Sequence, residues 1–225
     1  MPEPRFDDRR EGGRFLGDRL RAYAGQSDVQ VLALPRGGVP VGYEVARALG
    51  APLDVFLVRK LGAPRYGELA MGAIADGGVR VLNPSVISRL GISSEDIERV
   101  TAEETQELAR RAKRYREGRP PPLVRGKTVI LVDDGLATGS TMRAAVAALR
   151  QQGPRRLVVG VPVAAAQTCE ELEPEVVEVA CATTPEPFHA VGQWYRHFDQ
   201  TSDEEVHALL TLATHEQEAS HGVGR

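Results

Sequence analysis

Two adjacent carboxylates, Asp133 and Asp134, precede a short segment of small and hydroxyl residues that runs from Ala137 to Thr141. Backbone N–H groups at a helix N-terminus, helped by the hydroxyls of such a segment, form a binding site for an anion. Carboxylates do not hold phosphate, but they bind sugar hydroxyls or a metal ion. An anion site beside a carboxylate pair therefore predicts a sugar-phosphate ligand.

The elements around this segment fit that chemistry. Four branched apolar residues, Val129–Val132, come directly before the carboxylates and predict a strand that is buried on both faces. After the segment, Met142, Val146 and Leu149 recur at helical spacing. An ordinary strand–turn–helix crossover requires neither the acidic pair nor the hydroxyls. The sequence has no Walker-type Gly-x-x-x-x-Gly-Lys-Ser/Thr pattern and no Gly-x-Gly-x-x-Gly pattern.

A second strand–loop–helix unit carries a cation. The apolar run Val29–Leu34 predicts a strand, and a helix is expected to start at Pro40 and to end just before Gly50. Between them, Gly37 and Gly38 permit a backbone to approach a diphosphate closely. Arg36 supplies a charge-assisted hydrogen-bond donor. The alternative interpretation is a plain turn with a surface arginine.

The stretch from Val129 to Met142 closely resembles the phosphoribosyl-pyrophosphate (PRPP) motif of type I phosphoribosyltransferases, which has an apolar strand, an acidic pair and a Thr-Gly-x-Thr loop. The chain also resembles a group of stand-alone phosphoribosyltransferases with an Arg-Gly-Gly loop, here Arg36–Gly38, and an Arg-Lys-Leu-Gly lid, here Arg59–Gly62. The resemblance implies a three-layer α/β fold: a twisted, mostly parallel sheet of about five strands, with a small hood and a β-hairpin lid region.

The resemblance also implies roles for single residues. Asp133 and Asp134 would bind the ribose hydroxyls, directly or through Mg²⁺, which is the implied cofactor. The implied catalytic residues are Lys60, Asp133 and Asp134, with the two aspartates also as metal ligands. The implied phosphate contacts are Ala137, Thr138, Gly139, Ser140 and Thr141 for the 5-phosphate, and Arg36, Gly37, Gly38 and Lys60 for pyrophosphate.

A mobile lid is expected between the two motifs. Residues 61–70 are rich in glycine and proline, and they precede an expected hairpin around Asp76-Gly77-Gly78. In the resembled family a loop at this place closes over the substrate and keeps water from an oxocarbenium-like centre. Arg65 and Glu68 are weaker candidates for lid contacts, and a solvated loop charge is the alternative for Arg65.

The acceptor is less well specified. Hypoxanthine–guanine enzymes place a carboxylate where this chain has Ala137, so the resemblance argues against their acid–base mechanism. Phe188, Trp194 and Tyr195 could stack on an acceptor ring. The alternative is that these aromatic residues fix the C-terminal segment onto the core, and His189 and His197 are expected to have solvated or structural roles.

The chain is expected to form a single domain over residues 1–225, with the hood built from about 5–25 and 181–200. Lid and hairpin cover 59–83, a long helix covers 94–117, and 217–225 are expected to be disordered. A strand is expected over Leu53–Val58. The basic residues late in the long helix are interpreted as helix C-terminal cations that pair with Glu103, Glu104 and Glu107.

Composition limits the function classes. A net charge of −3 gives no footprint for nucleic acid or an anionic membrane. No run of apolar residues is long enough to span a membrane, the N-terminus lacks a signal peptide, and two cysteines make no disulfide framework. These features predict a cytoplasmic protein with small-molecule substrates, and a homodimer is compatible with the resemblance.

The leading hypothesis is an Mg²⁺-dependent phosphoribosyltransferase of nucleotide metabolism and nucleoside salvage, which moves 5-phosphoribosyl from PRPP to a nitrogenous acceptor, a purine or pyrimidine. The second hypothesis is a non-catalytic PRPP- or nucleotide-sensing regulatory module of the same fold. The third is a hydrolase, or another α/β enzyme, that uses only the phosphate loop.

Overall fold

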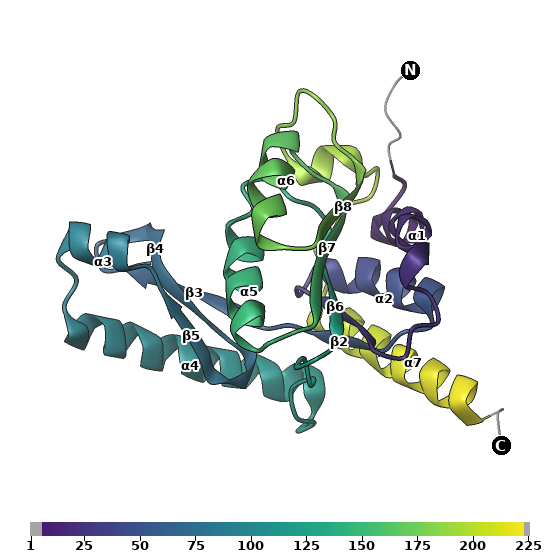
Figure 1. The fold of residues 1–225 in the computed structure, drawn as a ribbon, viewed down its shortest axis with the longest axis horizontal. Helices are drawn as coiled ribbons and strands as arrows, with labels where there is room; N and C mark the ends of the chain where they lie inside the picture. The colour runs from purple at the N-terminus through teal and green to yellow at the C-terminus, as the bar shows by residue number, and fades with distance from the viewer. Residues whose placement is uncertain (1–5, 223–225) are drawn as a thin grey trace.

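A five-stranded parallel sheet forms the centre of the molecule (Figure 1). The computed structural model describes residues 6–222, apart from the side chains of residues 67–68 and 220–222. The strands occur in the order β2-β1-β6-β7-β8, which confirms the predicted sheet. Their bounds are β1 (Val29–Ala33), β2 (Leu53–Val55), β6 (Thr128–Val132), β7 (Arg156–Val163) and β8 (Glu178–Thr183).

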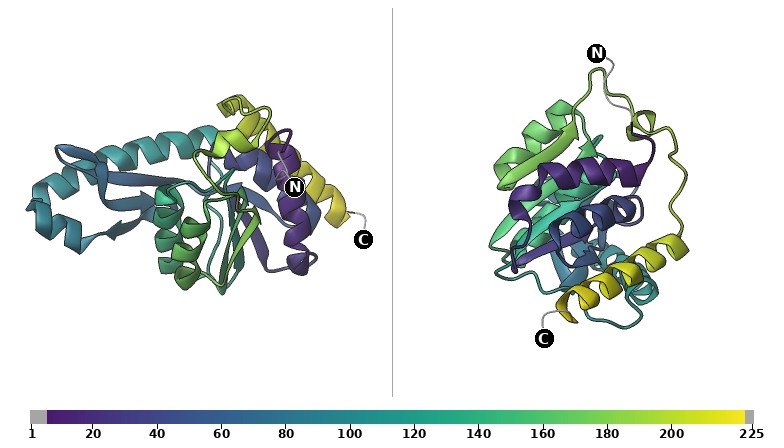
Figure 2. Two further views of the ribbon diagram at one scale, coloured as in Figure 1. Left: turned by 90° about the horizontal axis from the view of Figure 1, so that it is seen from above. Right: turned by 90° about the vertical axis from the view of Figure 1, so that its right-hand side faces the viewer.

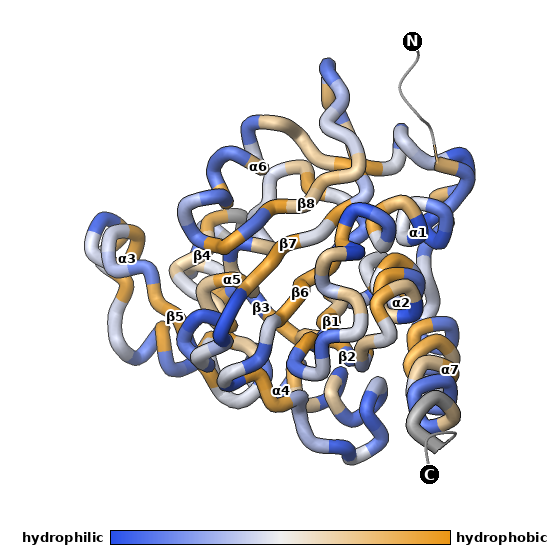
Figure 3. Tube along the Cα trace, turned by 45° about the vertical axis from the view of Figure 1, so that its right-hand side comes forward, coloured by the Kyte–Doolittle hydropathy of each residue, from blue (hydrophilic) through white to orange (hydrophobic). Residues whose placement is uncertain are grey.

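Helices cover both faces of this sheet. Along β6, Ile130 and Val132 pack into one apolar cluster with α1 and α2, while Val129 and Leu131 pack into another with α5 and α6. Successive side chains of a strand point to opposite faces, so an uninterrupted apolar strand needs cover on both. The apolar centre is visible in Figure 3. The helices are α1 (Arg9–Arg19), α2 (Gly38–Leu49), α5 (Ser140–Gln151) and α6 (Ala166–Leu172).

An arm extends from one side of the core (Figure 2). It consists of a three-stranded antiparallel sheet and two helices. The elements are β3 (Val58–Ala63), β4 (Tyr66–Ala75), β5 (Val79–Leu82), α3 (Pro84–Leu90) and α4 (Ser94–Arg116). The expected single strand over Leu53–Val58 is wrong, because the chain leaves the core sheet after Val55 and enters β3 at Val58. Arg59 and Lys60 therefore lie inside the arm sheet.

A buried guanidinium joins the arm to the core. Arg116, at the end of α4, is 2% exposed and donates two hydrogen bonds to the Asp76 carboxylate at 2.8 and 2.9 Å. The same guanidinium donates to Asp54 Oδ1 at 3.1 Å and to the Val55 carbonyl at 2.6 Å. Asp76 also accepts from the Leu57 N–H at 2.7 Å. One side chain thus fixes the hairpin turn, the end of β2 and the end of α4 together.

The basic part of α4 differs from its sequence interpretation. Glu107 does accept from Arg110 and Arg111, as expected for i,i+3 and i,i+4 pairs. Glu104 instead pairs with Arg59 of β3 at 2.5 Å, and Glu103 with Arg99. Arg116 is buried, and Arg114 pairs with Asp203 and Glu204 at the start of α7 (Asp203–Gly222). Contacts from distant parts of the chain therefore replace several pairings along the helix.

The N-terminal segment meets the segment that follows β8. Phe6 pairs with Tyr195 as an isolated parallel bridge, and the Phe6 N–H donates to the Trp194 carbonyl at 3.0 Å. Residue 5 of the predicted hood lies outside the described residues. Helix α7 (Asp203–Gly222) continues through residues 217–222, which were expected to be disordered, because no helix-breaking residue occurs before Gly222; residues 223–225 lie outside the described part. No helix within residues 6–222 is both long and apolar enough to cross a membrane.

Replacement of Arg116 by Met should destabilise the protein by about 3–5 kcal/mol at pH 8, because it leaves buried carboxylates without their cation. Burial already raises the pKa of Asp54, and Arg116 opposes that rise. Without Arg116 the folded-state pKa of Asp54 rises further, so protonation stabilises the folded variant as pH falls. The penalty should therefore shrink between pH 8 and pH 5, as measured by urea unfolding.

Arg99→Met is the matched control, because Arg99 lies on the same helix and is 53% exposed. It should change the free energy of unfolding by no more than about 0.5 kcal/mol. A penalty for Arg116→Met that is equally small, or that grows toward pH 5, contradicts the buried fork.

Candidate functional site

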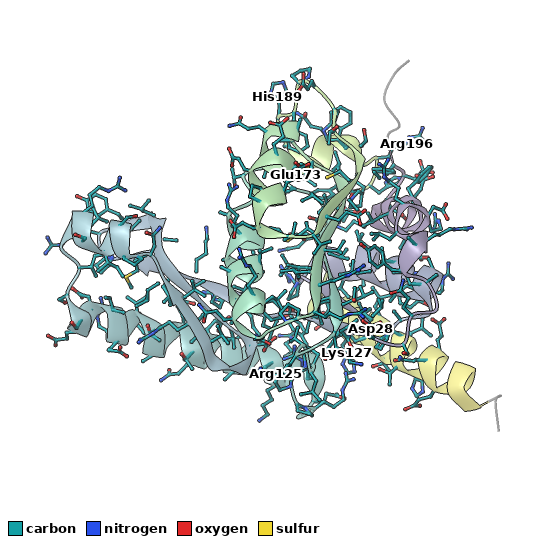
Figure 4. The ribbon with its side chains drawn as sticks, in the orientation of Figure 1. Asp28, Arg125, Lys127, Glu173, His189 and Arg196 are labelled. Carbon is teal, nitrogen blue, oxygen red and sulfur yellow. The ribbon has the colours of Figure 1, made fainter. Side chains whose placement is uncertain are left out.

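Both predicted loops lie at the point where the sheet reverses its strand order. β1 and β6 are neighbours, paired from Val29 with Thr128 to Ala33 with Val132. Chain connections run from β1 toward β2 on one side and from β6 toward β7 on the other, so the following loops diverge and leave a crevice. In Figure 4 the carboxyl ends of the parallel strands lie toward His189 and Arg196. Asp28 and Lys127, which precede β1 and β6, mark the opposite, amino ends.

The two loops are in direct contact. A Cβ on Gly38 would lie 2.8 Å from the Val132 carbonyl oxygen and 3.2 Å from Asp133 Oδ1. A Cβ on Gly37 would overlap the Asp134 carboxylate, with Cγ only 2.7 Å away. Glycine is therefore required at both positions by space, in addition to the backbone access that the sequence predicted.

The two carboxylates have different environments. Asp134 Oδ2 accepts from Arg9 Nε at 2.8 Å, and the Asp134 carbonyl accepts from the Tyr195 hydroxyl at 2.5 Å. Asp133 Oδ1 accepts the backbone N–H of Asp134 at 2.9 Å. Burial raises the pKa of Asp133 well above its usual range, and the neighbouring Asp134 carboxylate raises it further. Arg9 thus neutralises one carboxylate of the pair.

The segment Ala137–Thr141 leads into α5, which begins at Ser140. Gly139 is the N-cap of this helix and has a left-handed φ of 66°. Within the described residues, no side-chain hydrogen bond is made from the N-cap to the first turn. Ala137, Thr138, Ser140 and Thr141 are all exposed, whereas Gly139 is buried. The structure therefore presents an accessible helix N-terminus lined by hydroxyls, which suits an anion.

Thr168 of α6 supports this segment. Its hydroxyl donates to the Ala137 carbonyl at 2.6 Å, and its methyl group would lie 2.7 Å from a Cβ on Gly139. The Arg143 guanidinium binds the Thr138 carbonyl and donates to Glu171 at 2.8 Å. The loop is thus held by two side chains that the sequence analysis did not assign.

Arg36 points toward the arm. The peptide bond between Pro35 and Arg36 is cis. The Arg36 guanidinium lies 3.9 Å from Asp203 and borders a cavity with three arginines of α4: Arg110, Arg111 and Arg114. The cation predicted to meet a diphosphate is therefore part of a larger positive region.

Arg59 and Lys60 face different parts of the site because they are consecutive residues of β3. Lys60 is exposed and lines a groove of about 510 Å³ between the arm and α5, which also contains Ser140 and Arg143. Arg59 lies beside Pro35 and Thr141 in a small cavity between the two loops. Arg59, which was not assigned a role, thus shares a cavity with Pro35 of the Arg36 loop, whereas Lys60 lines the groove beside α5.

The two lid candidates lie at the outer end of the arm. Arg65 occupies the turn between β3 and β4, is exposed, and has a left-handed φ of 66°. Glu68 belongs to β4, but its side chain is outside the described part of the structure. The arrangement does not bring these residues to the loops, so their lid role stays a prediction.

The aromatic residues proposed for the acceptor form a small cluster with Phe6 and Val163. The Tyr195 ring is buried, 5.1 Å from Phe198 in a stacked arrangement and 5.7 Å from Phe6. Both rings pack against Tyr195, as expected if it fixes the C-terminal segment to the core. Phe188 is half-buried, and Trp194 has a buried indole N–H without a hydrogen-bond partner in the described chain.

The described side chains alone supply only part of a ligand set for a divalent cation. No group of three or more His, Cys, Asp or Glu side chains among residues 6–222 is arranged to hold a metal. Mg²⁺ is commonly bound by one or two carboxylates together with substrate phosphates and water. Asp133 and Asp134 fit that pattern, in which the substrate completes the ligand set.

The sequence analysis missed Arg9 and Thr168 because their partners are distant in the sequence. Arg9 is 125 residues from Asp134, and Thr168 is 31 residues from Ala137. Arg9 sits after the Asp8 N-cap of α1, a local feature with no indication of Asp134. Arg59 could have been found, because alternation along a strand places Arg59 and Lys60 on opposite faces.

Comparisons with known proteins agree with this geometry. A family model described as the phosphoribosyl transferase domain matches residues 9–196. Two Mycobacterium tuberculosis proteins, named "Putative phosphoribosyl transferase Rv0571c" and "Putative phosphoribosyl transferase MT0597", are each 47% identical over 208 residues. The alignment covers 92% of this chain and 47% of each relative. The chain thus spans about half the length of the curated relatives it matches.

Solved structures have the same fold. The crystal structure of TT1426 from Thermus thermophilus is 46% identical and superposes with a TM-score of 0.83, covering 92% of this chain and 97% of TT1426. A Neisseria gonorrhoeae protein solved with bound ppGpp is 15% identical, with a TM-score of 0.50, and the match covers 92% of this chain and 94% of that protein. The second similarity concerns the fold alone.

The contact between Gly37 and Asp134 can be tested by a double-mutant cycle. Gly37→Ala should destabilise the protein by roughly 1–3 kcal/mol, because the new methyl group overlaps the carboxylate. In the background of Asp134→Ala that carboxylate is absent, so Gly37→Ala should cost at least about 1 kcal/mol less. Urea unfolding of the four proteins measures the difference.

A parallel cycle with Gly25→Ala provides the control, because nothing in the described structure lies within 4 Å of a Cβ on Gly25. Gly25→Ala and Asp134→Ala should add to within about 0.5 kcal/mol. Additive behaviour of Gly37→Ala and Asp134→Ala would show that the loops do not touch as described.

Proposed function

Because the chain belongs to the phosphoribosyl transferase domain family, we propose that it transfers the 5-phosphoribosyl group of PRPP to a nitrogenous acceptor, a purine or pyrimidine, and releases pyrophosphate. An acceptor nitrogen forms a bond to C1 of the ribose while the bond from C1 to the diphosphate oxygen breaks. The observation that carries the proposal is the contact of Gly37 and Gly38 with Asp133 and Asp134. It joins two anion-type loops across a carboxylate pair, which matches a ligand with phosphates at both ends and hydroxyls between.

The 5-phosphate is assigned to the N-terminus of α5. Backbone N–H groups of the first turn and the hydroxyls of Thr138, Ser140 and Thr141 donate to it, with Ala137 and Gly139 completing the loop. Thr168 positions this loop through the Ala137 carbonyl without touching the phosphate.

The ribose is assigned to the carboxylate pair. Within the described part of the chain Asp133 forms no ion pair, so it is the better acceptor for a sugar hydroxyl, while Arg9 holds Asp134 in place. Both carboxylates could share Mg²⁺ with the substrate. When bound, Mg²⁺ neutralises and orients the leaving diphosphate.

The diphosphate is assigned to the loop at Arg36, Gly37 and Gly38. Arg36 donates charge-assisted hydrogen bonds as negative charge grows on the leaving oxygen. Lys60 is kept as a proposed catalytic residue, because it lines the same groove as Ser140. A small movement of the arm would bring its ammonium group closer to the diphosphate. Arg65 and Glu68 would reach the site only through a larger closure of the lid.

The acceptor stays open between purine and pyrimidine. Ala137 supplies no acid–base group, which argues against a hypoxanthine–guanine mechanism. The segment with Phe188, Trp194 and Tyr195 adjoins Asp134, so an acceptor near C1 would meet this hood. A transferase of this kind would act in nucleotide salvage.

One observation favours a second candidate, a non-catalytic module that senses PRPP or a nucleotide. Arg9 occupies Asp134, which leaves one carboxylate of the pair for a ligand. A binding protein needs no more than that, whereas a transferase must also activate the leaving group. Turnover distinguishes the two candidates.

In the presence of Mg²⁺, the protein should release pyrophosphate from PRPP only when one particular base of a panel is also present. A coupled pyrophosphate assay measures the release. Release without any base would indicate a hydrolase, and binding of PRPP without release would indicate a sensor. Either result contradicts transfer.

Asp133→Asn combined with Asp134→Asn should abolish Mg²⁺-dependent PRPP binding, because amides bind neither Mg²⁺ nor ribose hydroxyls as strongly as carboxylates do. Isothermal titration calorimetry measures the affinity. Asp18→Asn, at an exposed aspartate of α1, is the control and should bind PRPP as the unmodified chain does. Unchanged binding by the double variant would refute the assignment of the carboxylates.

Thr168→Val should raise KM for PRPP by roughly tenfold with a smaller effect on kcat, since it removes one hydrogen bond that positions the phosphate loop. The control is Thr214→Val, because Thr214 makes a similar hydrogen bond to the Leu210 carbonyl at 2.9 Å in α7. A fall in kcat alone would contradict a positioning role.

A further inference from the structure

A cavity of about 310 Å³ lies between the Arg36 loop and the second half of α4. We call it the arginine cavity. Its charged lining consists of four guanidinium groups and one carboxylate, with Pro35 and Tyr115 completing the wall: Arg36, Arg110, Arg111, Arg114 and Asp203. The reaction proposed above uses only Arg36 of these residues.

The nearby carboxylates do not balance the arginines one for one. Arg110 and Arg111 share the single carboxylate of Glu107, which is outside the cavity wall. Arg36 and Arg114 share Asp203, at 3.9 and 3.1 Å, and Arg114 also reaches Glu204 at 2.9 Å. Among the described residues, four cations thus face three carboxylates, of which only Asp203 lines the cavity.

Asp203 also accepts a hydrogen bond from the cavity wall. The Tyr115 hydroxyl donates to Asp203 Oδ1 at 2.6 Å, and burial with this hydrogen bond raises the pKa of Tyr115 to about 12. Tyr115 therefore stays protonated and keeps one carboxylate oxygen engaged. The guanidinium groups around the cavity retain donors beyond those that the shared carboxylates can accept.

The cavity continues toward the phosphate loops. Arg111 also lines the smaller cavity between the loops, together with Pro35, Arg59 and Thr141. Arg59 pairs with Glu104 of α4 at 2.5 Å. Arginines therefore follow one another from the N-terminus of α5, past the Arg36 loop, to the second half of α4.

We propose that the arginine cavity binds an oligophosphate anion, a diphosphate or longer chain, through Arg36, Arg110, Arg111 and Arg114. Planar guanidinium groups bind phosphate oxygens in pairs, and several of them around one space suit an anion with several adjacent phosphates. Two sources have this chemistry: the diphosphate released by the proposed reaction, and an independent oligophosphate that regulates the protein. The first source rests on the proposed function, whereas the second does not.

The test uses inorganic triphosphate as the probe, in metal-free buffer at fixed ionic strength, with binding measured by calorimetry. The full chain should bind triphosphate, and Arg110→Gln combined with Arg114→Gln should weaken binding by at least roughly tenfold. Arg110 and Arg114 are 63% and 46% exposed, so the variant should fold, which thermal unfolding verifies. Arg110→Gln alone gives an intermediate affinity if both residues contribute.

Arg99→Gln is the matched control, because it removes a partly exposed arginine from the same helix away from the cavity. It should change triphosphate affinity by less than about twofold, and inorganic monophosphate should bind much more weakly than triphosphate. Thr138→Ala combined with Ser140→Ala, which alters the 5-phosphate loop, should retain triphosphate binding.

Competition between triphosphate and PRPP would identify the released diphosphate as the source, and simultaneous binding would identify an independent oligophosphate; both support the cavity. The proposal is overturned if the chain does not bind triphosphate, if Arg99→Gln weakens binding as much as the double variant, or if the 5-phosphate-loop variant alone loses it. None of these measurements needs turnover, so failure of the transferase proposal and failure of this one are distinguishable.

Discussion

The parallel pairing of β1 with β6 is the constraint on which the site depends. Their register aligns Ala33 with Val132, so the chain leaves both strands at the same level and two loops enter the same crevice. The space between them is too small for a side chain at Gly37 or Gly38. Backbone N–H groups, carboxylates and a helix N-terminus are thereby concentrated within one crevice. The site is therefore a consequence of strand order, because the same motifs on separated strands would form two unrelated anion loops.

A second constraint sets the orientation of the arm. Arg116 reaches two carboxylates and one carbonyl from the last residue of α4, and its bidentate contact with Asp76 fixes direction as well as position. Buried ion pairs commonly contribute little net stability, so the stronger effect is on geometry. With the end of α4 anchored, the preceding turns of the helix pass the Arg36 loop, and Arg111 reaches the cavity beside Thr141. The buried arginine thus places the exposed ones.

Sequence reasoning succeeded where the chemistry is contiguous. The strand, the carboxylates, the hydroxyl loop and the α5 helix all follow from neighbouring residues, and the parallel sheet follows from apolar strands that alternate with helices. It was weaker where side chains from distant segments meet. The strand expected over Leu53–Val58 ends at Val55, where Arg116 binds Asp54 and the Val55 carbonyl. Arg116 and Asp54 are sixty-two positions apart in the sequence. The basic residues of α4 were assigned to local pairing because glutamates at helical spacing explain them adequately, and only the fold brings Arg36 and Asp203 beside them.

The N-terminal segment and the segment after β8 together surround Asp134. Phe6 and Tyr195 pair as a short bridge, Arg9 stacks on Phe198 with its guanidinium carbon 3.8 Å from the ring centroid, and the same guanidinium binds Asp134. The hood is therefore connected to the carboxylate pair by charge as well as by apolar packing. Movement of the hood would separate Arg9 from Asp134, so that both carboxylates of the pair would be available to a ligand. Under the proposed assignments, occupation of the acceptor side would be linked to charge at the ribose side through Arg9, which no local motif identifies.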